Sequence, residues 1–311
     1  MIKGAILVSM DKGSPPRPSC ILASKEEELI SAQKSKYSPI PLLTFFKECK
    51  NLNYPLAIVG LPCHFHGLYN ISKIFPEVSK NIKYKIGLIC GGVMLYSSMD
   101  YLIRKSGERF SGKWEIIYRD KSAGGYPGNI RISDNNRTVI LKKRYRISIK
   151  DYFIPPSCRI CFDKMNIFSD ITVGDPWGIK GFDYKNGSSV CVARNQIGNE
   201  VIENGIKKKY LNLQEIAYNR IIEGQQIQLK KKELNEYLNA WLTLKGEVPN
   251  YSNLFRFENN SSENSSYLEK LKFSFYINQL SSLELAFNEI DKKIHKKEKF
   301  RILKNLLKPK E

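Results

Sequence analysis

The strongest constraint on the fold is a pair of short apolar runs, each of which ends near a cysteine. Pro55–Gly60 (PLAIVG) precedes Cys63, and Tyr84–Ile89 (YKIGLI) runs directly into Cys90. Such runs are typical of buried strands, and residues 64–75 between them are long enough for a crossover helix. A strand–helix–strand unit makes its two strands parallel, with both carboxyl ends at one edge of the sheet. The sequence therefore predicts both thiols on one rim, where open α/β sheets hold their ligands.

A second thiol motif lies downstream, in the segment CRICFDKMNIFSDITVGDPWG that spans residues 158–178. Cys158 and Cys161 form a C-x-x-C pair, and its tight turn lets two sulfurs reach one metal centre. Asp163 follows the pair, and Asp170–Gly174 has the pattern of a short strand that ends in a glycine turn. That strand would bring the C-x-x-C loop to the same rim, so we expect four thiolates to converge there.

Four such thiols fit two kinds of inorganic site. Structural zinc sites usually take two close pairs of ligands, whereas this chain has one close pair and two separated cysteines. Iron-sulfur cubanes accept more scattered ligands, and the glycines beside the cysteines permit close approach of a bulky inorganic core. Spacing therefore favours a cluster over zinc. His64 and His66 flank Cys63, but a His-x-His pair at a helix start is more typical of capping or exposure, so we expect neither to be a ligand.

The remaining three cysteines, Cys20, Cys49 and Cys191, have no partner at metal-binding spacing, and we expect ordinary thiols. Seven cysteines in 311 residues are too few for a disulfide scaffold. No apolar run approaches the roughly 18 to 20 residues that span a bilayer, and the N-terminus lacks the pattern of a secretory signal. We therefore expect a cytoplasmic protein without a transmembrane segment.

The chain is strongly basic, with 50 Lys and Arg against 31 Asp and Glu and a formal charge of +19. Such a charge favours anionic partners, among them nucleic acid, an acidic protein, a phosphate-bearing cofactor or an anionic membrane surface. Because lysine is spread along the whole chain, solvated lysines account for most of the excess. No specific nucleic-acid partner is expected.

The other segments predict a mixed α/β (α+β) fold. Gly4–Ser9 has the pattern of a buried strand, and Asn129–Ser133 with Thr138–Lys142 predicts an antiparallel hairpin. Helical patterns run over residues 213–245, and the chain ends in an amphipathic helical segment. We therefore predict a mostly parallel sheet with crossover helices, an antiparallel hairpin section and a helical C-terminal extension.

The predicted division of the chain follows a composition change near its C-terminus. We expect a catalytic core over residues 1–245, in an N-terminal part (1–95) and a C-terminal part (96–245). An Asn- and Ser-rich stretch then marks the start of a basic helical extension over residues 259–311.

Several motifs, taken in order and at their spacing, resemble those of the coenzyme F420 hydrogenase/dehydrogenase beta-subunit family. They are GLPCHFHGL (60–68), KIGLICGGV (85–93), IIYRDKSAGG (116–125), the C-x-x-C to GDPWG segment (158–178) and Ser35-Lys36-Tyr37. The resemblance covers roughly residues 1 to 210. It extends well beyond the cysteines.

The resemblance implies an iron-sulfur flavoprotein oxidoreductase, which passes electrons between a [4Fe-4S] cluster, FAD and a two-electron acceptor such as coenzyme F420. By position, the implied cluster ligands are Cys63, Cys90, Cys158 and Cys161. The implied flavin contacts are Lys36, Tyr37, Arg119 and Lys121. The implied partners are a redox protein, such as a ferredoxin or a hydrogenase-type subunit, and a deazaflavin or other small-molecule acceptor. No residue stands out as a proton donor.

The sequence also departs from the family pattern. Leu61 and His64 stand where the family prefers Thr and Gln, and neither the usual Ser/Gly-rich turn ahead of Gly4 nor a ferredoxin-like domain is expected in this shortened form. Two alternatives therefore stay open. One is a truncated, non-catalytic electron-transfer or partner subunit, of a kind linked to surface-polysaccharide biosynthesis. The other is a zinc-stabilised protein that binds nucleic acid.

Overall fold

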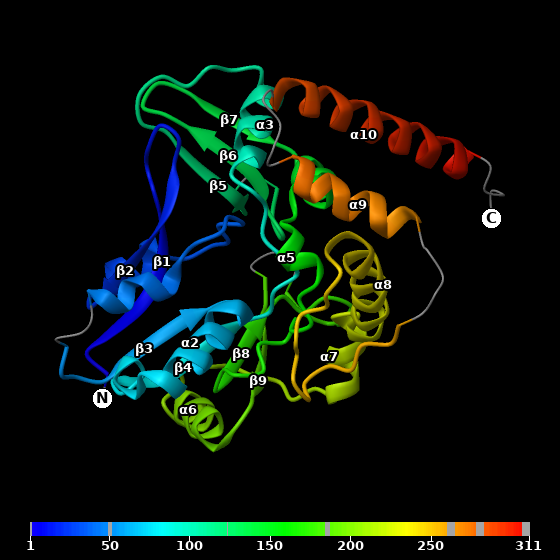
Figure 1. Cartoon of the computed structure of the whole chain (residues 1–311). Helices are drawn as coiled ribbons and strands as arrows, with labels where there is room; N and C mark the ends of the chain where they lie inside the picture. The colour runs from blue at the N-terminus through cyan, green and yellow to red at the C-terminus, as the bar shows by residue number, and fades with distance from the viewer. Residues whose placement is uncertain are drawn as a thin grey trace.

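A six-stranded sheet forms one half of the molecule, and a three-stranded sheet with its helices forms the other (Figure 1). The computed structural model describes residues 2–48, 52–122, 124–183, 187–259, 265–277 and 283–306. The large sheet has the order β2-β1-β3-β4-β8-β9, with the bounds β1 (Gly4–Asp11), β2 (Arg17–Ala23), β3 (Leu56–Gly60), β4 (Ile82–Leu88), β8 (Ile171–Gly174) and β9 (Val190–Ala193). The small sheet has the order β5 (Glu115–Asp120), β6 (Asn129–Ser133) and β7 (Thr138–Leu141).

The centre of the large sheet is parallel, as predicted. β1 pairs with β3, β3 with β4 and β4 with β8 in parallel, whereas the edge strands β2 and β9 are antiparallel. The predicted crossover is helix α2 (Pro62–Ile74), which begins directly after β3 with proline in its first turn. The predicted hairpin is also confirmed, because β6 and β7 pair antiparallel.

The remaining helices cover the two sheets and connect them (Figure 1). They are α1 (Glu26–Ser31), η1 (Leu42–Lys47), η2 (Pro76–Val78), α3 (Ser97–Ser106), α4 (Lys143–Phe153), α5 (Pro156–Arg159), α6 (Gln196–Lys207), α7 (Tyr218–Gly224), α8 (Ile227–Lys245), α9 (Ser265–Tyr276) and α10 (Leu283–Leu306). Within the described ranges, no helix combines the length and apolar character needed to cross a bilayer.

Strand β2 and helix α4 have no counterpart among the sequence predictions. Strand β2 begins in a proline-rich stretch, and Pro18 is accommodated because β2 is an edge strand that pairs only with β1. Helix α4 follows β7 without a side-chain cap on its first turn. The 3-10 helix η1 precedes Cys49, which itself lies outside the described residues.

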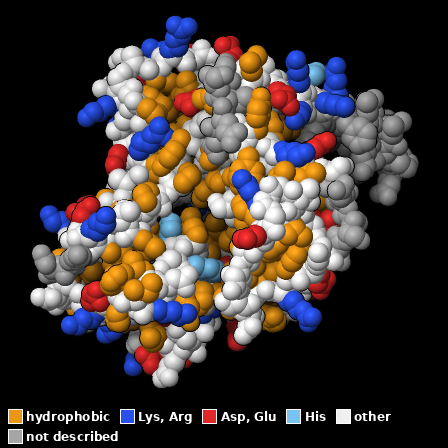
Figure 2. All heavy atoms as spheres, viewed as in Figure 1, with side chains coloured by type: hydrophobic (Ala, Val, Ile, Leu, Met, Phe, Trp, Pro, Cys, Tyr) orange, Lys and Arg blue, Asp and Glu red, His pale blue; other side chains and the backbone are white. Residues whose placement is uncertain are grey.

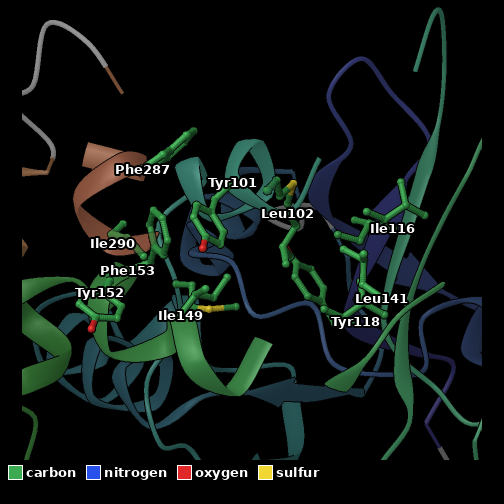
Figure 3. Close-up of a cluster of buried hydrophobic side chains, with 14 of the residues drawn as sticks. Tyr101, Leu102, Ile116, Tyr118, Leu141, Ile149, Tyr152, Phe153, Phe287 and Ile290 are labelled. Carbon is green, nitrogen blue, oxygen red and sulfur yellow. The ribbon is translucent and has the colours of Figure 1, made fainter. Parts of the chain in front are cut away.

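The largest apolar core lies between the small sheet and helices α3, α4 and α10 (Figure 3). Tyr101, Tyr118 and Phe153 are fully buried there, and Phe287 and Ile290 of α10 pack against them. Each such apolar side chain contributes about 2 kcal/mol by leaving water. The C-terminal segment is therefore helical, as predicted, and part of this core; its separation from the catalytic core as an extension stays a prediction.

Candidate functional site

Four cysteines from three segments meet at the rim of the large sheet. Cys63 lies in the first turn of α2, at the carboxyl end of β3, and Cys90 follows β4. Cys158 lies in α5, and Cys161 comes just after that helix. The Cys90 N–H donates to the Lys164 carbonyl at 3.0 Å, which ties the end of β4 to the C-x-x-C loop. The parallel strands thus place Cys63 and Cys90 at one rim of the sheet, as the sequence predicts.

The thiols are close enough to affect one another electrostatically. Burial raises the pKa of Cys63, and the charges of the other three thiols raise it further, although its side chain is open to solvent on one side. Burial likewise raises the pKa of Cys90, and that of Cys161 to about 11. Cys63, Cys90 and Cys161 are therefore protonated at neutral pH in the metal-free chain, and metal binding must release their protons.

The four thiols differ in their geometric requirements for a single metal ion and for a cluster. Among the described residues, no three His, Cys, Asp or Glu side chains are arranged to hold one metal ion. A structural zinc ion needs all of its sulfurs at about 2.3 Å from one centre. A cubane needs one thiolate at each of its separate iron corners, so its sulfurs lie further apart. Four thiols from three segments, within electrostatic range of one another, have the donor chemistry that a four-iron cluster takes.

Three lysines surround the thiols: Lys150 of α4, Lys164 of the C-x-x-C loop and Lys230 of α8. Burial lowers the pKa of each lysine, while the charge of Cys90 acts in the opposite direction on all three. A Cβ atom placed on Gly91, beside Cys90, would lie 3.1 Å from the Lys150 Nζ. Cations so close to the thiols favour a negatively charged group between them. Sequence reasoning missed these lysines because they are indistinguishable from the many solvated ones.

Asn166 holds the C-x-x-C loop against the sheet. Its side chain is fully buried, its φ is +57°, and its Nδ2 donates to the Gly60 carbonyl at 2.9 Å and to the Leu88 carbonyl at 3.3 Å. These carbonyls lie at the ends of β3 and β4, next to Cys63 and Cys90. Asn166 therefore fixes the distance between the loop and the rim, a role for which the sequence carries no signal.

Asp163 and His66 form a second link between the thiol segments. His66 Nε2 lies 2.9 Å from Asp163 Oδ2, which also accepts from the Ile167 N–H at 3.0 Å. The Asp163 carboxylate is almost fully buried. The acidic residue of the C-x-x-C-x-D pattern therefore anchors its own loop to the first turns of α2.

His64 caps the start of α2, in agreement with the capping role expected for it. Its Nδ1 accepts from the Leu61 N–H at 3.1 Å, so its Nε2 carries the proton that is donated to the Ile40 carbonyl at 3.2 Å. Burial lowers the pKa of His64 to about 4. The ring is therefore neutral at pH 7 and is not free to bind a metal.

Acid is expected to destabilise the fold through His64. Between pH 6.5 and 4 the unfolded chain takes up a proton that the folded chain does not, so the free energy of unfolding falls with decreasing pH. The loss attributable to His64 is about 2 kcal/mol at pH 5 relative to pH 7. Urea unfolding at both pH values should show that His64→Gln reduces this loss, whereas His295→Gln, at an exposed position, serves as the control. An equal loss in the His64 variant and the parent would contradict the prediction.

The Arg-Asp-Lys segment meets the Gly-Asp-Pro-Trp-Gly turn. Arg119 forms a bidentate ion pair with Asp175, with Nη1–Oδ2 and Nη2–Oδ1 distances of 2.7 and 3.1 Å. The Arg119 Nε donates to the Pro127 carbonyl at 2.9 Å. The Arg119 guanidinium and the Lys121 ammonium lie 5.3 and 5.9 Å from the centre of the Tyr126 ring. Two motifs far apart in the sequence thus form one cationic and aromatic cluster.

Tyr37 belongs to this cluster, but the Lys36 side chain is engaged elsewhere. The Tyr37 hydroxyl accepts from Arg146 Nη1 at 3.1 Å, and its ring packs edge-on against Tyr118 at 5.6 Å. The Lys36 ammonium donates to three carbonyls that follow α1: Ala32, Gln33 and Lys34. Burial lowers the pKa of Lys36 to about 8. The structure thus gathers Tyr37, Arg119 and Lys121, and the flavin contacts expected of all four residues stay predictions.

The two groups of residues are joined by α4. Lys150 near the thiols and Arg146 in the arginine–tyrosine cluster are one helical turn apart. Figure 2 shows the surface hollowed in the middle of the molecule, with histidine side chains at its edge on the side of the large sheet.

The fold and the site define an α/β protein with a four-thiol rim next to a cationic and aromatic cluster. The chain belongs to the coenzyme F420 hydrogenase/dehydrogenase beta-subunit family. Residues 1–47 match the family model for the N-terminal part of the coenzyme F420 hydrogenase/dehydrogenase beta subunit. Residues 55–218 match the family model for the C-terminal part of the same beta subunit. The family resemblance of the motifs is therefore confirmed.

Individual relatives agree with this assignment. The chain is 26% identical over 267 residues to the coenzyme F420-dependent sulfite reductase of Methanocaldococcus jannaschii, covering 78% of this chain and 38% of the relative. It is 23% identical over 207 residues to the coenzyme F420 hydrogenase subunit beta of Methanosarcina barkeri, covering 61% of this chain and 62% of the relative. The chain thus spans less than two thirds of either relative.

A solved structure shares the fold. A chain in the structure of the F420-reducing [NiFe] hydrogenase complex from Methanosarcina barkeri superposes with a TM-score of 0.55 and 16% identity, covering 84% of both chains. At this identity the likeness concerns the fold. It supports the mixed α/β architecture described above.

Proposed function

We propose that this chain is an iron-sulfur flavoprotein oxidoreductase. Its cluster ligands are Cys63, Cys90, Cys158 and Cys161, and its flavin is FAD. The observation that carries the proposal is that thiols from three segments come within electrostatic range of one another at the carboxyl ends of parallel strands. Membership in the family supports the same assignment, because the relatives named above are a coenzyme F420-dependent reductase and the beta subunit of a coenzyme F420 hydrogenase.

The residues of this chain have separable roles in such a site. A bound cluster and flavin supply the exchange between one-electron and two-electron transfer. Lys150, Lys164 and Lys230 compensate the negative charge of the thiolates and their metal. Asn166 and Asp163 hold the C-x-x-C loop at the distance from the rim that four ligands require. The aromatic rings of Tyr37 and Tyr126, with the neighbouring cations, offer stacking and charge to the flavin.

The proposed acceptor is coenzyme F420 or another small molecule that takes two electrons, and the proposed partner is a ferredoxin or a hydrogenase-type subunit. The names of the relatives support both. We propose a cytoplasmic location and the division into a core over residues 1–245 and a basic extension over residues 259–311.

The second candidate function is an electron-transfer subunit that holds the cluster without flavin. It is favoured because the Lys36 ammonium donates three hydrogen bonds to backbone carbonyls of its own loop.

Anaerobic purification of the full chain tests the proposal. We expect a brown protein with about four irons per chain and with FAD released on denaturation. Iron without flavin would favour the second candidate. A colourless protein that contains zinc and binds DNA in a salt-sensitive manner would contradict both.

Lys150→Met is expected to lower the reduction potential of the cluster. Reduction adds negative charge next to the Lys150 ammonium, so removal of that cation disfavours the reduced state. The expected shift is on the order of tens of millivolts, about 59 mV being a tenfold change for a one-electron couple. A redox titration followed by electron paramagnetic resonance measures it. Lys143→Met, at an exposed position on the same helix, is the control, and equal potentials in the two variants would rule out the role of Lys150.

A further inference from the structure

Arg146 is a buried cation whose charge is not balanced in its surroundings. The residue is 8% exposed, and within the described part of the chain it makes no ion pair and its Nε has no hydrogen-bond partner. Arg119 of the same cluster is balanced by Asp175. Arg159, also buried, pairs with Asp151. A buried charge without a counterion is costly, and a bound anionic group would offset that cost.

The side chains around Arg146 are aromatic. Its guanidinium lies 4.9 Å from the centre of the Tyr37 ring, and that ring packs edge-on against Tyr118. A guanidinium binds phosphates as well as planar anions, and the aromatic neighbours of Arg146 favour a planar one. Burial lowers the pKa of Arg146 and the charge of Arg119 lowers it further, against the opposite effects of Tyr37 and Asp175. An anionic and planar group fits this place best.

The position of Arg146 also relates the place to the thiols. Lys150 follows it by four residues on α4, which separates their Cβ atoms by about 6 Å along one face of the helix. The charges of Cys90 and Cys158 act on Lys150, and so does that of Arg146. One helix therefore presents a cation to each group of residues. A flavin ring bound beside Arg146 would lie next to the thiols. The phosphates of the same flavin cofactor could lie further from them.

We propose that Arg146 binds the redox-active ring of the flavin at its N1 and C2 carbonyl edge. This inference rests on the proposed function. That edge gains negative charge when the flavin takes up two electrons, so a fixed guanidinium beside it stabilises the reduced flavin more than the oxidised one. Tyr37 positions Arg146 by accepting its hydrogen bond. Arg146 is thus a determinant of the flavin's potential, distinct from the residues inferred from the family motifs.

The test compares Arg146→Gln, Arg146→Lys and the control Arg144→Gln in the full chain. Arg144 lies on the same helix and is exposed. The dissociation constant of FAD is measured anaerobically for the oxidised form and for the form reduced with dithionite, together with the iron content. We expect Arg146→Gln to weaken binding of reduced FAD at least tenfold more than binding of oxidised FAD, with iron unchanged. A tenfold difference equals a potential lowered by about 30 mV for this two-electron couple.

The remaining outcomes are equally decisive. Arg146→Lys keeps the positive charge but loses the bidentate hydrogen-bond donors of the guanidinium, so it should show a smaller effect in the same direction. If Arg146→Gln does not fold, the test uses Arg146→Lys in its place. An equal loss of both flavin forms, or no loss, would overturn the role of Arg146 and leave the flavoprotein assignment standing. Failure of the parent chain to bind FAD while it binds iron would overturn both.

Discussion

Cys158→Ser is expected to abolish the broad visible absorption that the iron-sulfur cluster gives the anaerobically purified chain. A cubane needs one thiolate for each iron, and a serine hydroxyl at this position is not deprotonated as readily as a thiol. Cys158 comes from the close pair whose loop is held at the rim by Asn166 and Asp163, so no other cysteine of that loop can replace it. We expect bound iron to fall by more than about tenfold, since the loaded site depends on all of its ligands.

The control for this variant is Cys191→Ser. Cys191 is a partly buried free thiol in β9, and the charges of the rim thiols are not among the causes that raise its pKa. Its replacement should leave the iron content and the spectrum unchanged. Circular dichroism of both apo variants shows whether they fold. Full iron content in a folded Cys158→Ser chain would refute the ligand assignment.

Asn166→Ala is expected to lower the free energy of unfolding by about 2 kcal/mol, because the buried Gly60 carbonyl and the partly buried Leu88 carbonyl each lose a donor. The same change leaves alanine at a φ of +57°, a backbone conformation that favours Asn over most residues. The effect should extend to the site, because the Gly60 and Leu88 carbonyls that Asn166 holds lie beside Cys63 and Cys90. Iron binding should therefore weaken as well.

Urea unfolding of the apo chain measures this loss. Asn204→Ala is a matched control, because Asn204 is exposed and its Nδ2 makes a single hydrogen bond, to the Glu200 carbonyl at 2.7 Å. A change at such a surface position is expected to stay within about 0.5 kcal/mol. Similar losses in the two variants would show that the Asn166 bridge does not stabilise the fold.

The elements of the fold that the sequence predicts are those specified by residues close together in the chain. The apolar run of β3, the proline at the start of α2 and the next apolar run of β4 predict a parallel unit without reference to any other segment. Helix α4 gives no such signal. Tyr145, Ile147 and Ile149 alternate with charged or polar residues, as in a strand, and the helix face that is buried includes an arginine.

Edge strand β2 was missed for a related reason. Its start at Arg17 and Pro18 has the composition of a loop, and only the presence of β1 as a partner makes it a strand. Pairing is a property of two segments, so the composition of one segment does not reveal it. The same holds for η1, where the sequence indicates a helix and packing against the large sheet's core selects the tighter 3-10 form.

The sequence by itself determined the strand–helix–strand unit, the antiparallel hairpin and the spacing of the four rim cysteines, because each depends on residue types at short and fixed separations. Only the tertiary structure decided which cations face the thiols, that Asn166 bridges two strand ends, and that Arg146 is buried beside Tyr37. Those features depend on contacts between residues far apart in the chain. A lysine or arginine has the same local pattern whether it faces water or a buried anionic group, and only the packing around it distinguishes the two.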